Sequence, residues 1–469
     1  MKAFLLVIIY ILLIFKMNSE NLRYLQPQPP NSNSNSNTYD YSNYASISSN
    51  ANIAEGTELK STTSDESVIY ITSPSITISN PNINKESGDS SNIENSEFYG
   101  VNAAVLVQGG EVEITGGTIT TSAKGANAIC ATNSGRVTIS GTTITSNGES
   151  SARGLHATYG GSITATNVQI SSTGGSCATL ATDRGEGTVT CDSCTLETGG
   201  SGSPLIYSTG QITVTGTTGT STGAQAVVVE GKNTASVTSS SNLKCYGIGN
   251  RGNVDQCGVM LYQSMSGDAD SGTSTFNCDS SILEILEQSS VYNQAPMFFI
   301  TNTDAAINLE GCTFTYGSNI FLSAAGTAEW GTAGSNGGVV TLNLKNQNIV
   351  GNFVVDENSG LTINMIGSSI QGTINGAKTA AKLSIIMDSS SSIQLTGNSY
   401  YTSLTNENTE GNNINKGSYE WDNYEETTIS RPTGNSGGPN DPFEPNGRKK
   451  KSNGKFLNIS LLLFLIILY

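Results

Sequence analysis

Residues 112–119 have the sequence VEITGGTI, and residues 137–144 have the similar sequence VTISGTTI. Related segments follow at intervals of 23 to 26 residues, and they begin at Ile163, Val189, Ile212 and Val237. In most of these segments apolar and polar residues alternate up to a bend of two Gly or polar residues, a pattern typical of a half-buried strand followed by a tight turn. A repeat near 25 residues indicates one supersecondary unit per repeat.

A second apolar segment precedes each of these strands. The six copies are AVLV from Ala104, AICA from Ala128, GLHA from Gly154, ATLA from Ala178, PLIY from Pro204 and AVVV from Ala226. Strands that repeat in one direction cannot close as hairpins, so each pairs with its equivalent in the next repeat, about 4.8 Å away. The sequence therefore predicts an all-β fold, a right-handed parallel β-helix with coils of about 22–26 residues and longer inserts in the later coils.

The composition changes along the chain and predicts five segments. Residues 1–19 resemble a signal peptide, because Lys2 precedes a short apolar run. Residues 20–60 are a low-complexity Asn/Ser spacer, residues 61–403 the β-helix domain and residues 404–455 a polar stalk. Residues 456–469 form an apolar tail that is too short to span a bilayer alone, and both a GPI-type attachment signal and a short membrane anchor fit it.

The terminal segments indicate where the protein is located, and its net charge limits which partners it can bind. We expect the protein on the extracellular face of the cell surface, attached to the membrane through the tail or a lipid anchor, or secreted. The net charge of -16 argues against a nucleic-acid partner, because phosphate binding needs clustered Lys and Arg. The expected partner is an extracellular glycan or the surface of a host or neighbouring cell.

Eight cysteines in a secreted chain favour disulfides. Cys245 and Cys257 bracket one insert and are candidates to staple it. Cys278 and Cys312 occupy nearby positions of consecutive coils and are candidates for a second disulfide. The remaining cysteines lie at strand or corner positions. The CxxC pair Cys191/Cys194 lacks the second ligand pair that a zinc site needs. Cys130 and Cys177 are expected equally to be free core thiols or disulfide partners.

Several segments carry a family resemblance. GLHATYGGSITA from Gly154, ATDRGEGTVT from Ala181, GVMLYQSMSGDAD from Gly258 and AEWGTAGSNGG from Ala328 resemble a family of secreted, adhesin-like β-helical proteins of gut anaerobes, often labelled carbohydrate-binding. The resemblance covers about residues 61–375. It implies a pectate-lyase-like fold and surface exposure, and it carries over no catalytic or ligand residue.

Charged and aromatic side chains on the turns, with further aromatic residues along the coils, give the candidate carbohydrate-binding residues, because rings stack on sugars and carboxylates bind their hydroxyls. These candidates are Tyr159, Asp183, Arg184, Glu186, Tyr207, Tyr262 and Trp330. For each of them local packing or a salt-bridged turn is the alternative interpretation. His156, the only histidine, falls in an apolar strand column and is interpreted as a packed side chain.

Two carboxylate pairs are the candidates for chemistry. Asp279 and Glu310 fall at the same position of adjacent coils, near the about 5–5.5 Å separation of a retaining glycosidase pair. Asp268 and Asp270 resemble a fragment of a Ca²⁺ loop without its remaining ligands, so no cofactor is expected apart from this candidate Ca²⁺ site.

The leading hypothesis is a cell-surface adhesin-like or carbohydrate-binding β-helix without catalytic activity. A polysaccharide lyase or glycoside hydrolase of the pectin-lyase-like class is the first alternative, with Asp279 and Glu310 as its catalytic residues. A structural surface-coat protein is the second.

Overall fold

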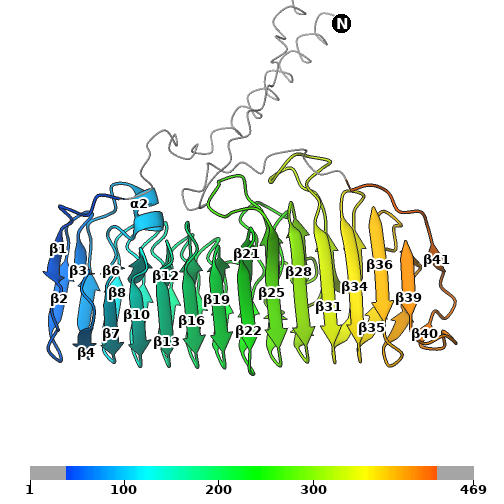
Figure 1. Ribbon diagram of the computed structural model, residues 1–469, viewed down its shortest axis with the longest axis horizontal. Helices are drawn as coiled ribbons and strands as arrows, with labels where there is room; N and C mark the ends of the chain where they lie inside the picture. Colours follow the sequence, from blue (N-terminus) through cyan, green and yellow to red (C-terminus); the bar gives the residue numbers. More distant parts are fainter. Residues whose placement is uncertain (1–38, 430–469) are drawn as a thin grey trace, which may run out of the picture.

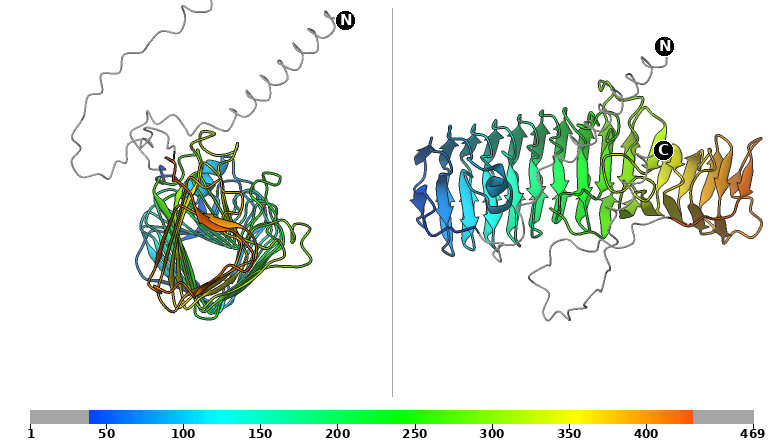
Figure 2. Two further views of the ribbon diagram at one scale, coloured as in Figure 1. Left: turned by 90° about the vertical axis from the view of Figure 1, so that its right-hand side faces the viewer. Right: turned by 90° about the horizontal axis from the view of Figure 1, so that it is seen from above.

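The computed structural model describes residues 39–429, which wind into a straight stack of coils (Figure 1). Viewed along the stack, three flat sides enclose a triangular cross-section (Figure 2). Every strand pairing between the described strands is parallel, as expected when each coil lies on the previous one. One short helix, α2 (Ile93–Tyr99), lies on the outside, and no helix among the described residues is long and apolar enough to cross a membrane.

Two of the three sides are continuous sheets. Sheet A has 12 strands: β1 Ser46–Ser49, β3 Ser67–Ile71, β6 Val105–Gln108, β9 Ile129–Thr132, β12 Leu155–Ala157, β15 Leu180–Thr182, β18 Ile206–Ser208, β21 Val227–Glu230, β24 Val259–Tyr262, β27 Phe298–Thr301, β30 Ile320–Ala324 and β33 Asn352–Val355. Sheet B has 13 strands: β4 Ile76–Ser79, β7 Glu111–Thr115, β10 Arg136–Ser140, β13 Ser162–Thr166, β16 Thr188–Asp192, β19 Gln211–Thr215, β22 Thr234–Thr238, β25 Thr273–Asp279, β28 Asp304–Glu310, β31 Val339–Lys345, β34 Gly360–Ile366, β36 Lys382–Met387 and β39 Ser403–Asn406.

The third side is divided into two sheets. Sheet C has ten strands: β2 Glu58–Ser61, β5 Asn82–Lys85, β8 Thr118–Thr121, β11 Thr143–Ser146, β14 Gln169–Ser172, β17 Thr195–Thr198, β20 Thr218–Ser221, β23 Asn242–Cys245, β26 Ile282–Ile285 and β29 Thr313–Thr315. Sheet D has four strands: β32 Asn348–Val350, β35 Ser369–Gly372, β37 Ser392–Leu395 and β40 Ile414–Asn415. A separate pair, β38 Ser399–Tyr401 and β41 Trp421–Asn423, lies at the C-terminal end.

The predicted alternation determines which side chains fill the interior. In β7, Val112 and Ile114 are buried while Glu111 and Glu113 are exposed. The same register continues into β10, where Val137 pairs with Val112. The predicted right-handed parallel β-helix is therefore confirmed, with the apolar columns forming one long core inside the stack.

A tight bend between sheets B and C requires left-handed backbone. At the bend after β7, Gly117 has a φ of 72°, and a Cβ there would lie 2.2 Å from the carbonyl oxygen of Pro81. Only glycine fits that approach. In other coils Asn80 and Asn167 adopt positive φ at this bend, as asparagine tolerates this conformation best among residues with a Cβ.

Strands extend beyond both predicted boundaries of the β-helix. β1 begins at Ser46, before the predicted start at 61, and β40 and β41 lie after the predicted end at 403. The segment predicted as spacer contributes Tyr41 and Tyr44, which pack on the outer face of sheet A. The sequence SISS of β1 did not indicate a strand, because its small polar residues lack the apolar alternation of the later strands. The predicted signal peptide and the apolar tail lie outside the described residues.

The predicted repeat period is wrong by two residues at one place. The sequence pattern aligns Val237 with Ile212, whereas the structure pairs Val237 with Val214 and Ala235 with Ile212. The alanine at the first inward position of β22 weakens the apolar signal on which that alignment depends.

Later coils first lengthen and then contract, and the third side breaks where they contract. Val339 of β31 pairs with Gly360 of β34, 21 residues further on, against 25 residues between Thr121 and Ser146 in early coils. After β32 a single residue, Gly351, connects to β33. The smaller coil shifts the third side, so that β32 does not pair with β29.

A buried lysine in the first coils donates hydrogen bonds to backbone carbonyl groups. Lys85 in β5 is fully buried, and its ammonium donates to the carbonyl oxygens of Thr63 and Glu66, the latter at 2.9 Å. Burial lowers the pKa of Lys85 to about 8, because desolvation disfavours the charged form.

We expect Lys85→Met to flatten the pH dependence of stability at alkaline pH. Between pH 8 and 10.5 the unfolded chain binds this proton and the folded chain does not, so wild-type stability gains a contribution as the pH rises through that window. Denaturant unfolding at both pH values measures it. Lys124→Met, at an exposed position, is the matched control. Equal pH slopes for wild type and Lys85→Met would contradict the prediction.

Candidate functional site

Most of the predicted binding residues gather on the outer side of sheet A and on the turns that follow its strands. Tyr207 and Tyr262 come from β18 and β24, and both donate hydrogen bonds to the buried carboxylate of Glu230, at 2.6 and 2.8 Å. Trp330, on an insert, packs edge-on against Tyr262 at 5.2 Å between ring centroids. Burial raises the pKa of the Glu230 carboxyl, and the hydroxyl donors oppose that shift.

Asp183 belongs to a buried ionic network under α2. Its carboxylate accepts a hydrogen bond from the Arg153 guanidinium at 2.8 Å, and both side chains are almost fully buried. The same guanidinium lies 2.8 Å from Nε2 of His156. Burial raises the pKa of Asp183 to about 7, although Arg153 opposes the shift, and it lowers the pKa of His156. The prediction that His156 is packed agrees with its complete burial.

The remaining predicted residues of this surface pair with neighbours from other turns. Arg184 donates to Asp268 at 2.8 Å, and its guanidinium lies 3.9 Å from the ring centroid of Phe98 in α2. Tyr159 stacks on Tyr99 with a centroid separation of 5.6 Å. Arg184 and Tyr159 are therefore engaged by neighbouring side chains of the protein itself.

Ion pairs also occupy the carboxylates of the candidate Ca²⁺ site. Lys232 contacts Glu186 and Asp270, each at 2.9 Å, while Asp268 faces Arg184. Within residues 39–429 no group of three or more His, Cys, Asp or Glu side chains is arranged to hold a metal ion. Asp268 and Asp270 are therefore ion-pair partners in this structure.

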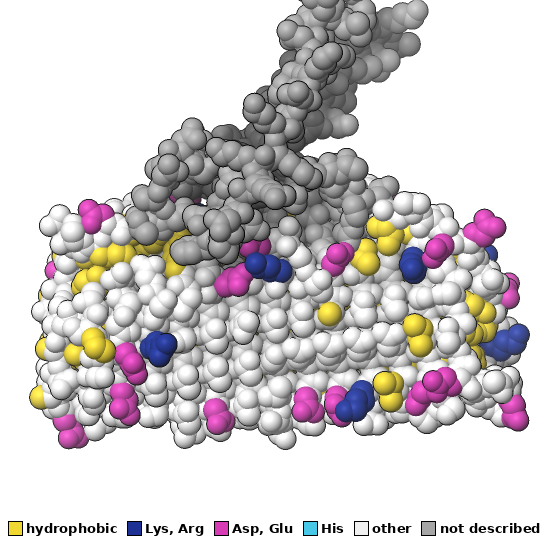
Figure 3. All heavy atoms as spheres, in the orientation of Figure 1, with side chains coloured by type: hydrophobic (Ala, Val, Ile, Leu, Met, Phe, Trp, Pro, Cys, Tyr) yellow, Lys and Arg dark blue, Asp and Glu magenta, His cyan; other side chains and the backbone are white. Residues whose placement is uncertain are grey.

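The two candidate catalytic carboxylates lie where the register predicted. Asp279 of β25 pairs with Glu310 of β28 on adjacent rungs. On the next rung Lys345 contacts Glu310 at 2.9 Å, and both of these side chains are substantially exposed. The face shown in Figure 3 presents such charges singly or in small mixed groups among uncharged polar side chains. Asp279 and Glu310 are thus part of a solvated charged ladder.

The cysteine predictions divide into one confirmed disulfide and one wrong one. Cys278 and Cys312 form a disulfide, with 6.4 Å between their Cα atoms. Cys245 and Cys257 are both free, because Cys245 points into the central core whereas Cys257 packs outside sheet A against Met260. The other four cysteines, Cys130, Cys177, Cys191 and Cys194, are also buried and free.

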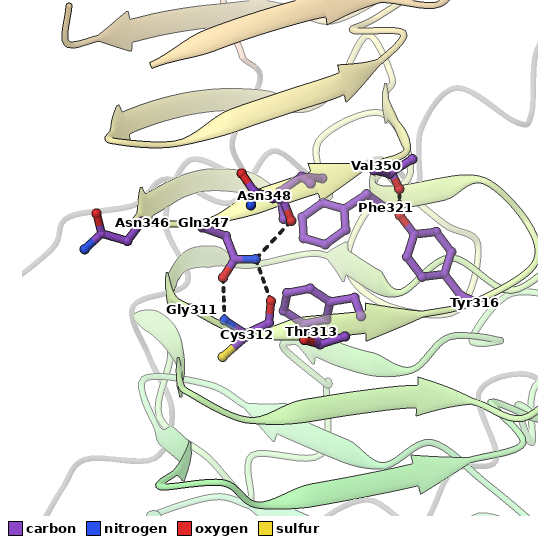
Figure 4. Close-up of a pocket in the computed structure, with 11 residues that line it drawn as sticks. Gly311, Cys312, Thr313, Tyr316, Phe321, Asn346, Gln347, Asn348 and Val350 are labelled. Atoms are coloured by element: carbon purple, nitrogen blue, oxygen red, sulfur yellow. Dashed lines mark hydrogen bonds between the residues drawn. The ribbon is translucent and has the colours of Figure 1, made fainter. Parts of the chain in front are cut away.

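A cleft opens where sheet C ends and sheet D begins (Figure 4). It lies between β29 and β32 and encloses a volume of about 360 Å³, within the range of small-ligand sites. Phe314, whose ring points to the interior, is partly exposed here, whereas Phe321 behind it is fully buried. The two rings lie 5.3 Å apart, so the cleft has an aromatic floor that continues into the core.

Amide groups form the polar rim of the cleft. The Gln347 side chain lies buried at the edge of the cleft, where it accepts from the Cys312 amide and donates to the Cys312 carbonyl, both at 2.7 Å. Tyr316 donates to the Val350 carbonyl at 2.6 Å from the opposite end. Asn348 is exposed beside them, and no residue that lines this cleft carries a charge. The cleft therefore combines a partly exposed aromatic ring with the exposed amides of Asn346 and Asn348, which suits an uncharged polyhydroxyl ligand.

None of these cleft residues was among the sequence-based candidates for binding or catalysis, although Cys312 was a disulfide candidate. The segment 346–348, NQN, was the available signal, since it places three amides at one bend. Their proximity to Phe314 depends on the change of coil size, which strand patterns do not reveal.

Comparison with known families agrees with this architecture. Residues 82–243 match a family model described as a right handed beta helix region. This matched part of the β-helix ends before β25, so the cleft lies in coils that the family model does not cover. The searches of curated proteins and of solved structures found no match.

Proposed function

We propose that this protein is a cell-surface, adhesin-like β-helix that binds a glycan without cleaving it. The observation that carries this proposal is the cleft between β29 and β32, where aromatic rings and amides line an uncharged hollow. The signal-like and tail-like sequences at the two ends support display outside the cell. The resemblance to adhesin-like β-helical proteins supports the same setting.

Binding is preferred to cleavage because of the position of the candidate carboxylates. Glu310 forms an ion pair with Lys345. Asp279 and Glu310 both lie on the solvated side of sheet B, and neither lines the cleft. A glycosidase needs two carboxylates on either side of the scissile bond. The cleft supplies hydrogen bonds and stacking but no such pair.

A glycan array probed with the full-length chain tests the proposal. The array holds neutral glucans, mannans, xylans and galactans, together with polygalacturonate and heparin as acidic glycans. We expect binding to at least one neutral glycan and no release of products from it. If the protein binds none of the neutral glycans, the proposal is overturned.

The cleft itself is tested by Asn348→Ala, which removes an exposed amide from its rim. We expect the Kd for the bound glycan to rise about tenfold, equivalent to one lost hydrogen bond to a ligand. Gln169→Ala, at an exposed position of β14 on the same side of the β-helix, is the matched control and is expected to bind normally. Titration calorimetry measures both. Equal affinities for the two variants would contradict the assignment of the cleft.

A further inference from the structure

A second hollow lies on sheet D, next to the cleft. It is open to solvent and has a volume of about 360 Å³, and above the buried Ile370 and Ile393 it is lined by outward side chains of β35, of β37 and of residues 412–415, which include β40. These side chains are hydroxyls and amides, among them Gln371, Gln394 and Asn415. As in the cleft, none of the lining residues is charged, on a chain whose net charge is -16.

Strand register places the two hollows on one continuous face. Asn348 of β32, at the rim of the cleft, pairs with Ser369, which pairs with Ser392. Val350, which also lines the cleft, heads a second outward column that continues through Gln371 and Gln394. Asn415 of β40 ends that column. Both columns run along the axis of the β-helix, the first from β32 to β37 and the second from β32 to β40.

Beyond the first rung the columns present only hydroxyl and amide side chains, with an amide at each rung of the second column. From β32 to β40 there are three rung spacings, about 14 Å in total. The pyranose units of an extended glycan repeat at an interval close to one rung spacing. Amide side chains in step with that interval can donate to and accept from successive sugar hydroxyls. Val350, 69% exposed, offers an apolar contact beside the cleft.

We infer that sheet D carries an extended binding track for a neutral polysaccharide chain that runs parallel to the β-helix axis. One end of the chain occupies the cleft between β29 and β32, and successive units lie over β35, β37 and β40. This inference rests on the proposed function and extends it from one cleft to a series of subsites. The absence of charged side chains from both hollows selects neutral over uronate-containing chains.

The test uses the neutral glycan that binds the array most tightly, prepared as the disaccharide and the tetrasaccharide, with full-length protein. We expect the tetrasaccharide to bind about tenfold more tightly than the disaccharide, because it reaches the outer subsites. The double variant Gln371→Ala/Gln394→Ala is expected to weaken the tetrasaccharide to the level of the disaccharide and to leave the disaccharide unchanged. Gln169→Ala is again the control.

The outcomes separate the track from the cleft. Equal affinity for the two lengths, or a double variant that binds both as wild type does, overturns the track while Asn348→Ala still reports on the cleft. Tighter binding of polygalacturonate than of any neutral glycan also overturns the track. Failure of the wild type to bind any neutral glycan overturns both.

Discussion

Replacing Arg153 with methionine is expected to lower the free energy of unfolding by about 3–5 kcal/mol near pH 8, because it leaves a buried carboxylate without its counter-ion. Arg153 is the cation within ion-pair distance of Asp183, and it also contacts His156 and lies 3.8 Å from Glu97. Methionine fills a similar volume without charge. Equilibrium unfolding in denaturant measures the loss.

The loss is expected to shrink on acidification. In the wild type burial raises the pKa of Asp183 to about 7 and Arg153 opposes that shift, so removing Arg153 raises the pKa of Asp183 further. Because the unfolded state is common to both proteins, the variant loses stability relative to wild type as the pH rises above about 7, and it is closer to wild type at pH 5 than at pH 8. Measurements at the two pH values give the comparison.

Two further variants define the cause of this loss. Arg136→Met removes an exposed arginine of β10 and is expected to change stability by less than about 0.5 kcal/mol. Adding Asp183→Asn to Arg153→Met is expected to cost less than the sum of the single changes, because the two side chains interact directly. Wild-type stability of Arg153→Met at pH 8, or strict additivity, would show that the network is not coupled as the structure indicates.

Phe298→Ala is expected to destabilise the later coils by about 3–5 kcal/mol, the usual cost of removing a buried aromatic ring. Phe298 is fully buried, and its ring lies between 5.2 and 5.7 Å from those of Phe276, Phe314 and Phe321. These rings interdigitate at the centre of the core, so no neighbour can fill the space that alanine leaves. Hydrogen exchange of β27 and denaturant unfolding measure the change.

The same substitution is expected to affect the cleft, because Phe314 forms its floor and packs on Phe298. We therefore expect weaker glycan binding together with lower stability. Val354→Ala, at a position of β33 that is 47% exposed, controls for a change of apolar residue in the same coils. A Phe298→Ala protein as stable as Val354→Ala would contradict the view that this aromatic cluster holds the later coils together.

The fold could be predicted from the sequence because its physical cause is local and repeated. Apolar residues at alternate positions, as at Val112 and Ile114, determine which face of each strand is inward, and the two-residue bends follow from Gly and Asn. The same strand register brings Cys278 close to Cys312, so their disulfide follows from the spacing of the repeats. Local periodicity therefore carries the architecture and one disulfide.

The inserts could not be predicted in this way, because their placement depends on contacts between turns of different coils. Cys245 and Cys257 lie on opposite sides of sheet A, although only an insert separates them in sequence. Tyr41 and Tyr44 belong to a segment with a polar composition, yet they cover apolar side chains of sheet A. Such contacts leave no periodic signal.

The candidate site shows the same division. The candidate binding residues were recognised by type and turn position alone, but pairs such as Arg184 with Asp268 and Tyr262 with Glu230 satisfy those side chains internally. The cleft between β29 and β32 arises instead from a contraction of the coil. That contraction changes which strands pair, and it exposes Phe314 where an uninterrupted sheet would have covered it.

The most direct test of glycan binding is a crystal structure of the full-length protein with the neutral tetrasaccharide that the array selects. We predict one sugar in the cleft, over Phe314 and within hydrogen-bond distance of Asn348, and the next units along sheet D toward Asn415. Sugar bound instead over the turns that follow sheet A, with the cleft empty, would contradict this account.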